Sequence, residues 1–509
     1  MARFQAKRVV RTVLIGMAAV LLVVFGSGRL VLSQQVLTVA TEPVYAPFEF
    51  QENGELKGFD VDVIQEAGKA AGFGVKFQNI AFDGIIPALT SGQIDAAIAA
   101  MTITQQRSQS VAFSRPYFKA GLGIATRQGA PKYTRLEELK GKVVGVQIGT
   151  TGAKAVQDIG DVQTRTYDSA PLVLQAVSNG NVTAAVHDAP ILQYALRTGS
   201  VKGVQVSDQL LTQEYYGIPT PLNSPNLQKI NQGLNTILSN GTYARIYRKW
   251  FGTEPPALPA TAPGITVENK QVSWLSILVG AFPNLIKGAF VTLQLTIVSV
   301  ALGLVLGSLI GIARISKALP VRWLARVYID FFRGTPLLIQ IFIIYFGIPS
   351  VIQSLGLQFT FNRFLAAVIA LSLNSAAYIA EIVRGGIGSI DVGQTEAAQS
   401  LGLDGRQTMR YVIFPQAFRR MLPPLGNEFI SLLKDTSLVS IIGFEELFQQ
   451  GRLIVATNYQ PFTVFVGVAI VYLVLTLLSS QGFSYLERLM NPVKRNKPAP
   501  KSMAKPQPQ

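Results

Sequence analysis

The strongest constraint on the fold is a series of long apolar runs in the second half of the chain. Five such runs lie near residues 285–313, 335–355, 364–384, 429–450 and 462–483. Each is long enough for one bilayer crossing, which takes about 20 residues in an α-helix. The fourth run is the weakest, because it contains Glu428, Lys434 and Asp435 at its start. We therefore expect an all-α membrane domain with five transmembrane helices; the role of Lys434 and Asp435, lining a polar path or reaching the interface, stays open.

The distribution of charge predicts how these helices are oriented. The chain has a formal net charge of +16, yet residues 34–262 are nearly neutral, with 19 basic and 18 acidic side chains. The remaining basic residues cluster at the N-terminus and after the first, third and fifth runs, and the other short loops hold only Arg363 and Arg452. By the positive-inside rule, the clusters lie in the cytoplasm and residues 34–254 lie outside it. Basic residues beside apolar runs also argue against a nucleic-acid-binding face.

The rest of the chain divides by composition. Residues 1–33 join a basic start to an apolar stretch, which is typical of a cleaved signal peptide or of a retained membrane anchor. Residues 34–254 alternate short β-rich runs (36–40, 143–147, 184–186) with helical stretches (61–71, 224–240), which predicts an α/β domain with a mainly parallel sheet. Residues 255–272 form a proline-rich linker, 273–490 the membrane domain, and 491–509 a basic tail expected to be disordered.

Several kinds of chemistry are excluded. The chain has no cysteine and one histidine, His187, so disulfides, cysteine nucleophiles and common zinc motifs are absent. Residues 149–154 resemble a phosphate-binding loop but lack its Gly-Lys-Ser/Thr ending, so the chain cannot hydrolyse ATP itself. A hydrolase built on His187 and Asp188 has no nucleophile motif beside it. We expect no enzyme activity, no metal and no cofactor.

Sequence fragments of the α/β segment resemble periplasmic amino-acid-binding proteins, most closely those for glutamine. They occur in the family's order: TEPVYAPFEF (41–50), GFDVD (58–62), FDGIIPAL (82–89), TITQQR (102–107), GTTG (149–152), HD (187–188), YGI (216–218), NGTY (240–243) and KWFGTEP (249–255). The resemblance covers nearly all of 36–256. It implies a two-lobed type II binding-protein fold that closes by a hinge around its ligand.

The resemblance also implies a set of substrate-binding residues. Arg107 would hold the α-carboxylate, and Asp188, with Thr102 and the Ala100 carbonyl, would hold the α-ammonium. Tyr45 and Phe82 would enclose the aliphatic stem, although either ring could instead be an ordinary core aromatic. The remaining expected members are Glu42, Gln147, His187, Thr150, Thr151 and Tyr216.

Three positions depart from the glutamine-binding pattern and bear on the substrate. Glu42 stands for a shorter aspartate, Gln147 for a lysine and Thr151 for a glycine. The Gln147 amide can both donate and accept, which suits glutamine; loss of the lysine argues against glutamate, and Glu42 could attract a basic amino acid. Glutamine is our preferred substrate, with basic amino acids or glutamate as alternatives.

The membrane segment resembles the permeases of ABC importers for polar amino acids (the His/Glu/Gln/Arg family). The fragments EAAQSLG (396–402) and VIFP (412–415) match the spacing of the EAA loop, with Val412 and Phe414 in place of isoleucine and leucine; RGTPLLIQ (333–340), AYIAEIVRGG (377–386) and KDTSL (434–438) extend the match over about 283–490. The resemblance implies a type I importer fold. It also implies that a coupling loop at about 391–416 docks on a separate cytoplasmic ABC ATPase.

Small residues give this coupling loop a physical rationale. Glu396, Ala397 and Ala398 would begin a short helix that a partner can approach closely, and Gly402 would allow a sharp turn after it. Pro415 is expected to stop the following helical element from running on into it.

Together these observations predict a multi-pass bacterial plasma-membrane subunit whose binding domain is extracytoplasmic. Two such chains would pair as a homodimer, or one chain would pair with a second permease, and two ATPase copies would bind their loops. A ligand-gated channel is the main rival of a different class. It would need a pore helix within the second lobe, whereas here every apolar run follows the whole domain.

Overall fold

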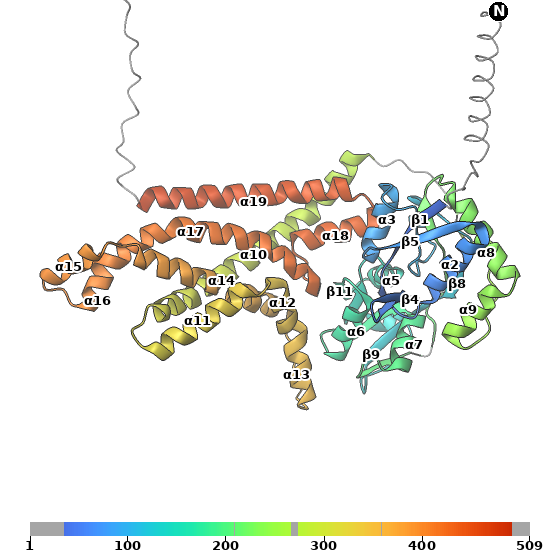
Figure 1. Cartoon of the computed structure of the whole chain (residues 1–509), viewed down its shortest axis with the longest axis horizontal. Coiled ribbons are helices and arrows are strands. Elements are labelled where there is room, and N and C mark those ends of the chain that lie inside the picture. The colour runs from blue at the N-terminus through green and yellow to red at the C-terminus, as the bar shows by residue number, and fades with distance from the viewer. Residues whose placement is uncertain (1–34, 208, 266–272, 358, 491–509) are drawn as a thin grey trace, which may run out of the picture.

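The computed structural model describes residues 35–207, 209–265, 273–357 and 359–490. The expected signal or anchor and the basic tail lie outside the described residues, as does part of the linker. An α/β domain occupies one side of the molecule and an elongated helical domain the other (Figure 1).

Lobe 1 of the α/β domain is built on a three-stranded parallel sheet in the order β5-β1-β6. Its strands are β1 (Gln35–Thr41), β5 (Phe73–Asn79) and β6 (Ala96–Ala97). Helix α2 (Phe59–Ala71) connects β1 to β5 and buries Phe59, Val63 and Ala67, which recur at helical spacing on one face. Gly72 ends α2 in the left-handed conformation (φ 78°) that glycine adopts readily.

Further elements complete lobe 1. They are α3 (Phe82–Thr90), α4 (Gln105–Ser108), α8 (Asn226–Ser239), α9 (Thr242–Phe251), the small sheet of β2 (Val44–Tyr45), β3 (Glu49–Glu52) and β4 (Glu55–Lys57), and the pair β7 (Val111–Phe113) and β15 (Pro219–Pro221). Aromatic rings fill the core where α2 and α9 meet, with Phe59 in edge contact with Tyr243, Tyr247 and Phe251.

Lobe 2 contains a five-stranded sheet in the order β11-β10-β12-β9-β13. The strands β10 (Val143–Gln147), β11 (Gln163–Tyr167) and β12 (Ala184–Asp188) run parallel, whereas β9 (Leu122–Arg127) and β13 (Val204–Val206) are antiparallel to their neighbours. A short 3₁₀ turn, η1 (Leu136–Leu139), and helices α5 (Thr151–Ile159), α6 (Ala170–Ser178) and α7 (Ala189–Thr198) connect the strands. The predicted α/β alternation is confirmed, with an antiparallel edge on the second sheet.

The chain passes between the lobes twice. It leaves lobe 1 through β8 (Phe118–Ala120) and returns through β14 (Glu214–Tyr216), and these two strands pair antiparallel. Two short crossing strands are the geometry in which a few backbone torsions can open or close a cleft between rigid lobes.

The helical domain contains three helices long and apolar enough to cross a membrane. They are α10 (Trp274–Arg314), α14 (Arg363–Gly388) and α19 (Pro461–Met490). Gly307 and Gly311 let α10 pack closely on α14, because a Cβ at either position would stand 2.7–2.8 Å from Ile379 or Val383. Small residues of this kind are how membrane helices approach one another.

Fewer than five of the described helices are long and apolar enough to cross a membrane, so the expected number of five is not reproduced. Helices α11 (Leu319–Gly334) and α12 (Leu337–Phe342), continued by the π-helical turn η2 (Ile343–Gly347) and α13 (Ile348–Ser354), form a pair bent by 104°, so the described residues give three spans, or four if this pair counts as one. The bend follows Pro336, which disfavours helical backbone at the residue before it.

The run at 429–450 is wrong as a single span. Helix α17 (Phe414–Asp435) ends inside it and is followed by the 3₁₀ turn η4 (Thr436–Ile442) and by α18 (Leu447–Asn458). Gly443, in the left-handed conformation at φ 68°, ends η4 and redirects the chain.

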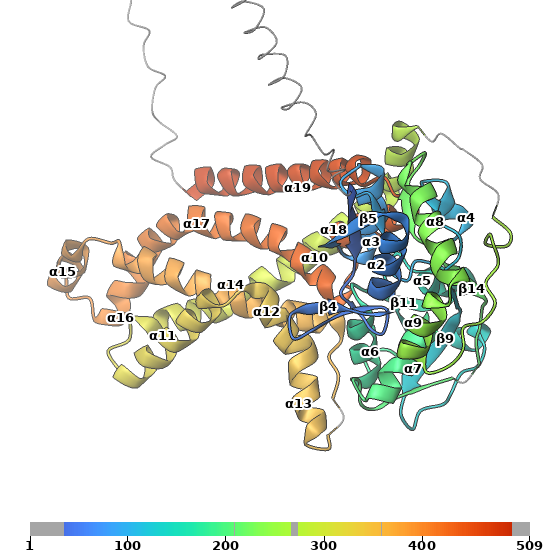
Figure 2. The ribbon, with the colours of Figure 1, turned by 45° about the vertical axis from the view of Figure 1, so that its right-hand side comes forward.

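The two functional ends predicted from sequence lie far apart. The α/β domain packs against the end of the helical domain formed by α12, α13 and α18, whereas α15 (Val392–Ser400) and α16 (Gly405–Gln407) lie at the opposite end of α14 and α17 (Figures 1 and 2). The long helices connect the two ends.

Candidate functional site

Strand ends from both lobes converge on the cleft. Glu42 follows β1 of lobe 1, while Gln147 ends β10 and His187 and Asp188 end β12 of lobe 2. The carboxyl ends of parallel strands are where ligands bind in open α/β sheets. The structure therefore brings these four sequence-predicted residues, together with Tyr45 of lobe 1, into one buried cluster.

One end of the cleft holds a chain of hydrogen bonds that crosses between the lobes. Gln147 Nε2 donates to Glu42 Oε2 (2.8 Å), and Gln147 Oε1 lies 3.1 Å from His187 Nε2. The Asp188 backbone N–H donates to His187 Nδ1 (2.8 Å), and the Tyr45 hydroxyl lies 3.4 Å from the same nitrogen. Because Nδ1 accepts, His187 carries its proton on Nε2 and donates to Gln147.

Burial shifts the titration of both ends of this chain. Burial raises the pKa of the Glu42 carboxyl to about 7, against the opposing hydrogen bonds from Gln147 and the Phe82 backbone. Burial lowers the pKa of His187 to about 4, so the imidazole is neutral at neutral pH. At neutral pH this end of the cleft thus offers a neutral imidazole, an uncharged amide and a carboxyl that is only partly ionised.

Arg107 lies at another part of the cleft and bridges the lobes. Its side chain is buried, Nη1 donates to the Thr102 carbonyl of lobe 1 (2.7 Å) and Nη2 donates to the Gly149 carbonyl of lobe 2 (2.9 Å). The guanidinium carbon lies 5.2 Å from the centre of the Phe82 ring. Arg107 is therefore a buried, positioned cation of the cleft.

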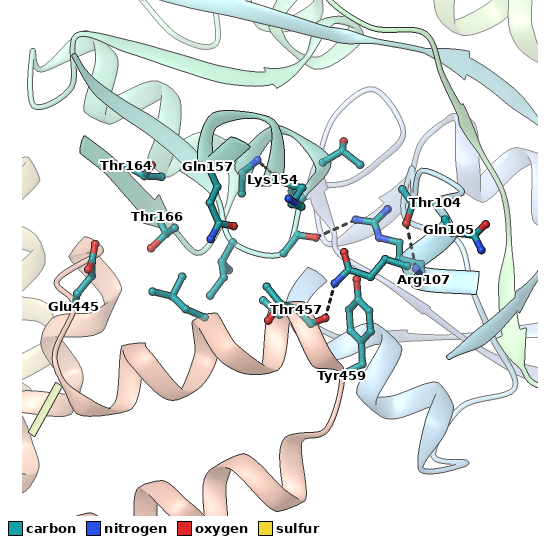
Figure 3. A pocket seen from close by; sticks show the side chains of 18 residues that line it. Thr104, Gln105, Arg107, Lys154, Gln157, Thr164, Thr166, Glu445, Thr457 and Tyr459 are labelled. Atoms are coloured by element: carbon teal, nitrogen blue, oxygen red, sulfur yellow. Dashed lines mark hydrogen bonds between the residues drawn. The ribbon is translucent and has the colours of Figure 1, made fainter. Parts of the chain in front are cut away.

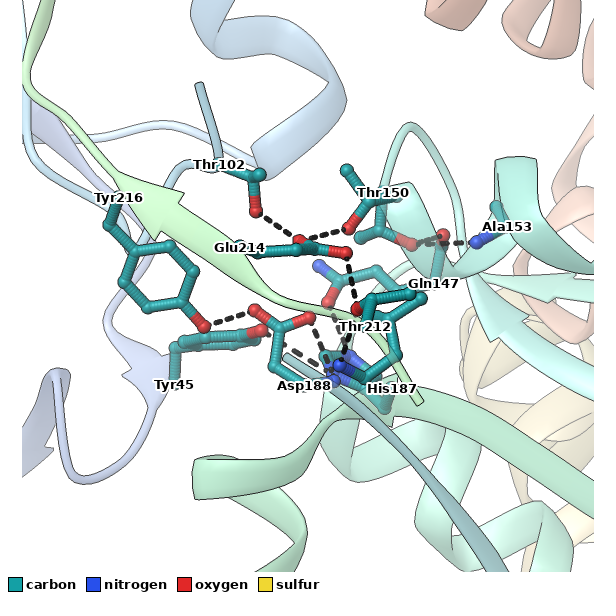
Figure 4. A network of polar contacts seen from close by, with 12 residues as sticks. Tyr45, Thr102, Gln147, Thr150, Ala153, His187, Asp188, Thr212, Glu214 and Tyr216 are labelled. Atoms are coloured by element: carbon teal, nitrogen blue, oxygen red, sulfur yellow. Dashed lines mark hydrogen bonds and ion pairs between the residues drawn. The ribbon is translucent and has the colours of Figure 1, made fainter. Parts of the chain in front are cut away.

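Acidic groups gather around Asp188 (Figure 4). The Tyr216 hydroxyl donates to Asp188 Oδ2, and burial raises the pKa of this carboxyl. Glu214 lies next to it, and its Oε2 accepts from Thr102 (2.7 Å) and Thr151 (2.9 Å), one threonine from each lobe.

Glu214 was missed by sequence reasoning. It begins β14, two residues before the YGI fragment at 216–218, and Thr212 also donates to it (3.1 Å). An acidic residue at the start of a crossing strand was the available signal. Its meaning depends on where the strand lies, which the sequence does not reveal.

Thr150, Phe82 and Ala100, the other expected site residues, take part in hydrogen bonds that fix the backbone around the cleft. Thr150 caps the N-terminus of α5, since its hydroxyl accepts from the Ala153 N–H (3.2 Å). Phe82 begins α3 and donates its N–H to Glu42 Oε1 (3.4 Å). Ala100 has a positive φ of 45°, and its N–H donates to Asp60 (2.8 Å), which fixes the backbone where its carbonyl is expected to act.

A cavity of about 440 Å³ lies where the two lobes meet α18 (Figure 3). Arg107, Gly149, Thr150 and Thr151 line it from the α/β domain, and Leu453, Ala456, Thr457 and Tyr459 line it from the helical domain. The cleft and the membrane domain are therefore in direct contact. Among the described residues, no group of three or more His, Asp or Glu side chains is placed to hold a metal ion.

The expected coupling loop forms two short helices joined by a turn. Glu396, Ala397 and Ala398 lie within α15, which begins at Val392 and not, as expected, at Glu396. Ala397 is exposed whereas Ala398 is buried, and Gly402 turns the chain at φ 83°. Leu401 is 84% exposed at the tip. An exposed apolar tip on a short helix is a surface that a partner could cover.

The expected role of Pro415 is wrong. The backbone runs from α16 through the π-helical turn η3 (Thr408–Ile413) straight into α17, and Pro415 lies in the first turn of that helix. Pro415 lies just after the π-helical turn, where the α-helical hydrogen-bonding pattern is already interrupted, so its missing N–H is tolerated.

Two protein families match successive parts of the chain. Residues 37–253 match the bacterial extracellular solute-binding proteins, family 3, and residues 303–492 match the inner membrane component of binding-protein-dependent transport systems. Both families are transport components and not enzymes, so the chain is not an enzyme.

Individual relatives agree with this division. The glutamine transport system permease protein GlnP of Escherichia coli (strain K12) is 44% identical over 220 residues, which are 43% of this chain and 98% of that protein. The arginine transport system permease protein ArtQ of Bacillus subtilis (strain 168) is 39% identical over 203 residues, 40% of this chain and 90% of that protein. A solved structure of an ancestral arginine-binding protein bound to arginine is 41% identical, covers 43% of this chain and 98% of its own, and has a TM-score of 0.41.

A two-lobed domain with a polar cleft is thus followed, on one polypeptide, by a helical domain that matches amino-acid permeases over nearly their whole length. The chain belongs to the amino-acid ABC importers, as a multi-pass inner-membrane permease fused to a family 3 solute-binding domain.

Proposed function

We propose that this subunit imports glutamine, which its binding domain captures outside the cell and passes to its own membrane domain. The observation that carries the proposal is the cleft, which holds the Arg107 guanidinium, the Asp188 carboxyl and a hydrogen-bonded Gln147–Glu42 pair together. An amino acid has two backbone charges and a side chain to satisfy, and each needs a partner once water is excluded.

The cleft supplies a partner for each group. Arg107 directs two of its five N–H donors toward carbonyl oxygens of opposite lobes, and its remaining N–H groups can bind a substrate carboxylate at the same time. Asp188 and Glu214 offer acceptors for the ammonium, and Tyr45 and Phe82 offer apolar surface for the stem. At the far end, the Gln147 amide and a Glu42 carboxyl with a pKa of about 7 can exchange donors and acceptors with a carboxamide.

A basic amino acid is the second candidate, and one observation favours it. The cleft contains the carboxyls of Glu42, Asp188 and Glu214 against the single guanidinium of Arg107 among the side chains described above. A cationic side chain would pair with Glu42 and return its pKa toward the ordinary range.

Substitution of Glu42 separates the two candidates. The full chain in lipid nanodiscs would be titrated with glutamine, arginine and glutamate, before and after Glu42→Gln. For a glutamine carrier, the variant should bind glutamine within about tenfold of the parent, because an amide replaces a carboxyl in the same hydrogen bonds. For an arginine carrier, removing the partner of a buried charge costs about 2–5 kcal/mol, or roughly 30-fold or more in affinity.

Titration of the parent chain already distinguishes the main outcomes. Tightest binding of arginine would replace glutamine with the second candidate, and failure to bind any of the twenty amino acids would refute the proposal.

The arrangement of the whole chain follows from the same proposal. The binding domain (34–254) lies outside the cytoplasm after a signal peptide or anchor (1–33), the linker (255–272) tethers it, and the membrane domain (273–490) presents its coupling loop to the ATPase. Two chains pair as a homodimer. The basic side chains beside the loop and the separation of the two ends in Figure 1 support this orientation.

A further inference from the structure

The two lobes contact the membrane domain to different extents. Lobe 2 makes several contacts with it: Tyr167 with Tyr345, Gln175 with Ser350, Asn179 with the Phe346 carbonyl, and Thr166 with Gln449. Gly443 lies so close to the Thr166 carbonyl that any Cβ there would overlap it. Lobe 2 is therefore seated on η2, η4 and α18 by backbone and side chain alike.

Lobe 1 is attached at fewer described points. Gln106 donates to the Thr457 carbonyl (2.5 Å), and Tyr459 packs on the cluster of α3 that contains Ile85 and Leu89. A further polar contact is the ion pair between Asp83 and Arg452 of α18.

Arg452 joins both lobes through one guanidinium. Its Nη2 and Nε lie 2.9 Å and 3.2 Å from Asp83 Oδ2 in lobe 1, and its Nη1 lies 2.6 Å from Asp168 Oδ1 in lobe 2. The side chain is only 12% exposed. A planar fork with fixed donor directions can reach two carboxylates at once only while they are held at one separation. That separation is set by how far the lobes are closed.

Each partner of Arg452 is one step from the cleft. Asp83 follows Phe82, whose N–H donates to Glu42, and the Asp168 backbone carbonyl accepts from Gln147 (3.3 Å). Arg452 therefore lies directly behind the end of the cleft proposed to recognise the substrate side chain.

We infer that Arg452 is a positioning residue through which the membrane domain senses lobe closure: it pairs with both lobes only when they are closed, so docking and closure around an amino acid strengthen each other. Lobe 2 remains seated on the membrane domain while lobe 1 swings. Opening separates Asp83 from Asp168 and breaks at least one of two partly buried ion pairs. This inference rests on the proposed capture of an amino acid between the lobes, and not on which amino acid it is.

The absence of cysteine allows a direct measurement of closure. Gln65→Cys on lobe 1 and Lys140→Cys on lobe 2 place two dyes on exposed sites of the full chain, reconstituted in lipid nanodiscs and titrated with glutamine and arginine. Coupling between sites changes affinity by about 5- to 150-fold, so Arg452→Ala should raise the concentration for half-closure at least about fivefold. It should also raise the open fraction without ligand.

The matched control is Arg384→Ala. This arginine also pairs with a carboxylate, that of Glu381, but it lies near the coupling-loop end of α14, away from both lobes, so its loss should change half-closure by less than about twofold. Arg452→Lys keeps the charge without the fork and should fall between the parent and Arg452→Ala. Asp83→Asn combined with Arg452→Ala should add little to either single change.

The outcomes are distinct. Equal effects of Arg452→Ala and Arg384→Ala on half-closure and on the ligand-free open fraction would overturn the inference. A parent chain that no amino acid closes would instead refute the proposed function, while the ligand-free open fractions would still test Arg452.

Discussion

Replacing Arg107 with alanine should remove amino-acid binding through two separable losses. The first is the partner of the substrate carboxylate; truncating one member of a buried, hydrogen-bonded charge pair costs about 2–5 kcal/mol, or roughly 30-fold to several thousand-fold in affinity. The second is the pair of bonds to the Thr102 and Gly149 carbonyls, which join the lobes in the closed form. A hydrogen bond to a charged donor contributes about 1.5–3 kcal/mol, so closure itself should weaken.

Equilibrium binding of radiolabelled glutamine, and of arginine, to the full chain in nanodiscs measures the combined loss. Arg107→Lys separates the two contributions, because it retains a charge for the carboxylate but cannot span both carbonyls; it should bind more weakly than the parent and more tightly than Arg107→Ala. Arg115→Ala is the matched control, since that lobe 1 arginine donates to Asn235. Binding by Arg107→Ala within about threefold of Arg115→Ala would show that the assigned role of Arg107 is wrong.

Three further predictions concern pH, the coupling loop and docking. Burial holds the pKa of His187 at about 4, below its usual 6.5, so its contribution to stability should disappear as pH falls from about 6.5 to 4; Glu42, raised from 4.5 to about 7, contributes oppositely and loses stability as pH rises through that range. As pH falls from about 7 to 4, the thermal stability of Glu42→Gln should therefore decrease by up to about 3 kcal/mol relative to the parent, whereas that of His187→Gln should increase by a similar amount; equal pH profiles of the two variants would contradict this. Ala397→Trp places a large ring on exposed α15 and should abolish recruitment of the ATPase in co-purification while glutamine binding persists; retained ATPase would remove the loop from that role. Gly443→Val should unseat lobe 2, because a side chain there overlaps the Thr166 carbonyl, and faster proteolysis of the linker than in Gly402→Val would measure it.

Local patterns were sufficient for much of the fold. The apolar face of α2, with Phe59, Val63 and Ala67, and the strand β10 have the periodicity of buried elements, and each was located to within a few residues. The long helices α10, α14 and α19 follow from the apolar content of their sequences alone. The break at 436–446 was missed although Gly443, Glu445 and Glu446 interrupt the apolar run there. The change of direction itself depends on the packing of Gly443 on lobe 2, which no local pattern reveals.

Some residues of the candidate site could likewise be predicted from local sequence patterns, whereas others depend on contacts between the lobes. Glu42, Gln147, His187 and Asp188 end or follow strands, so their convergence follows from parallel-sheet geometry once the strands are recognised. Glu214 lies on a crossing strand, and its partners Thr102 and Thr151 come from different lobes. No spacing in the sequence specifies a contact that exists only when two lobes close.

The distribution of basic residues pointed to the docked interface, although the sequence alone did not show why two arginines lie in loops where such residues are scarce. Arg363 and Arg452 were the two basic residues left in short loops on the side where such residues are scarce. In the structure, each lies where the membrane domain meets lobe 2 or both lobes: Arg363 donates to the carbonyl of Gly443, which packs on Thr166, and Arg452 pairs with Asp83 and Asp168. These two arginines are exceptions to the charge bias of the loops, and each has a partner in the docked structure: carboxylates for Arg452 and a carbonyl for Arg363. Because the linker keeps that domain close, two ion pairs and a few hydrogen bonds are enough to favour docking without making it permanent.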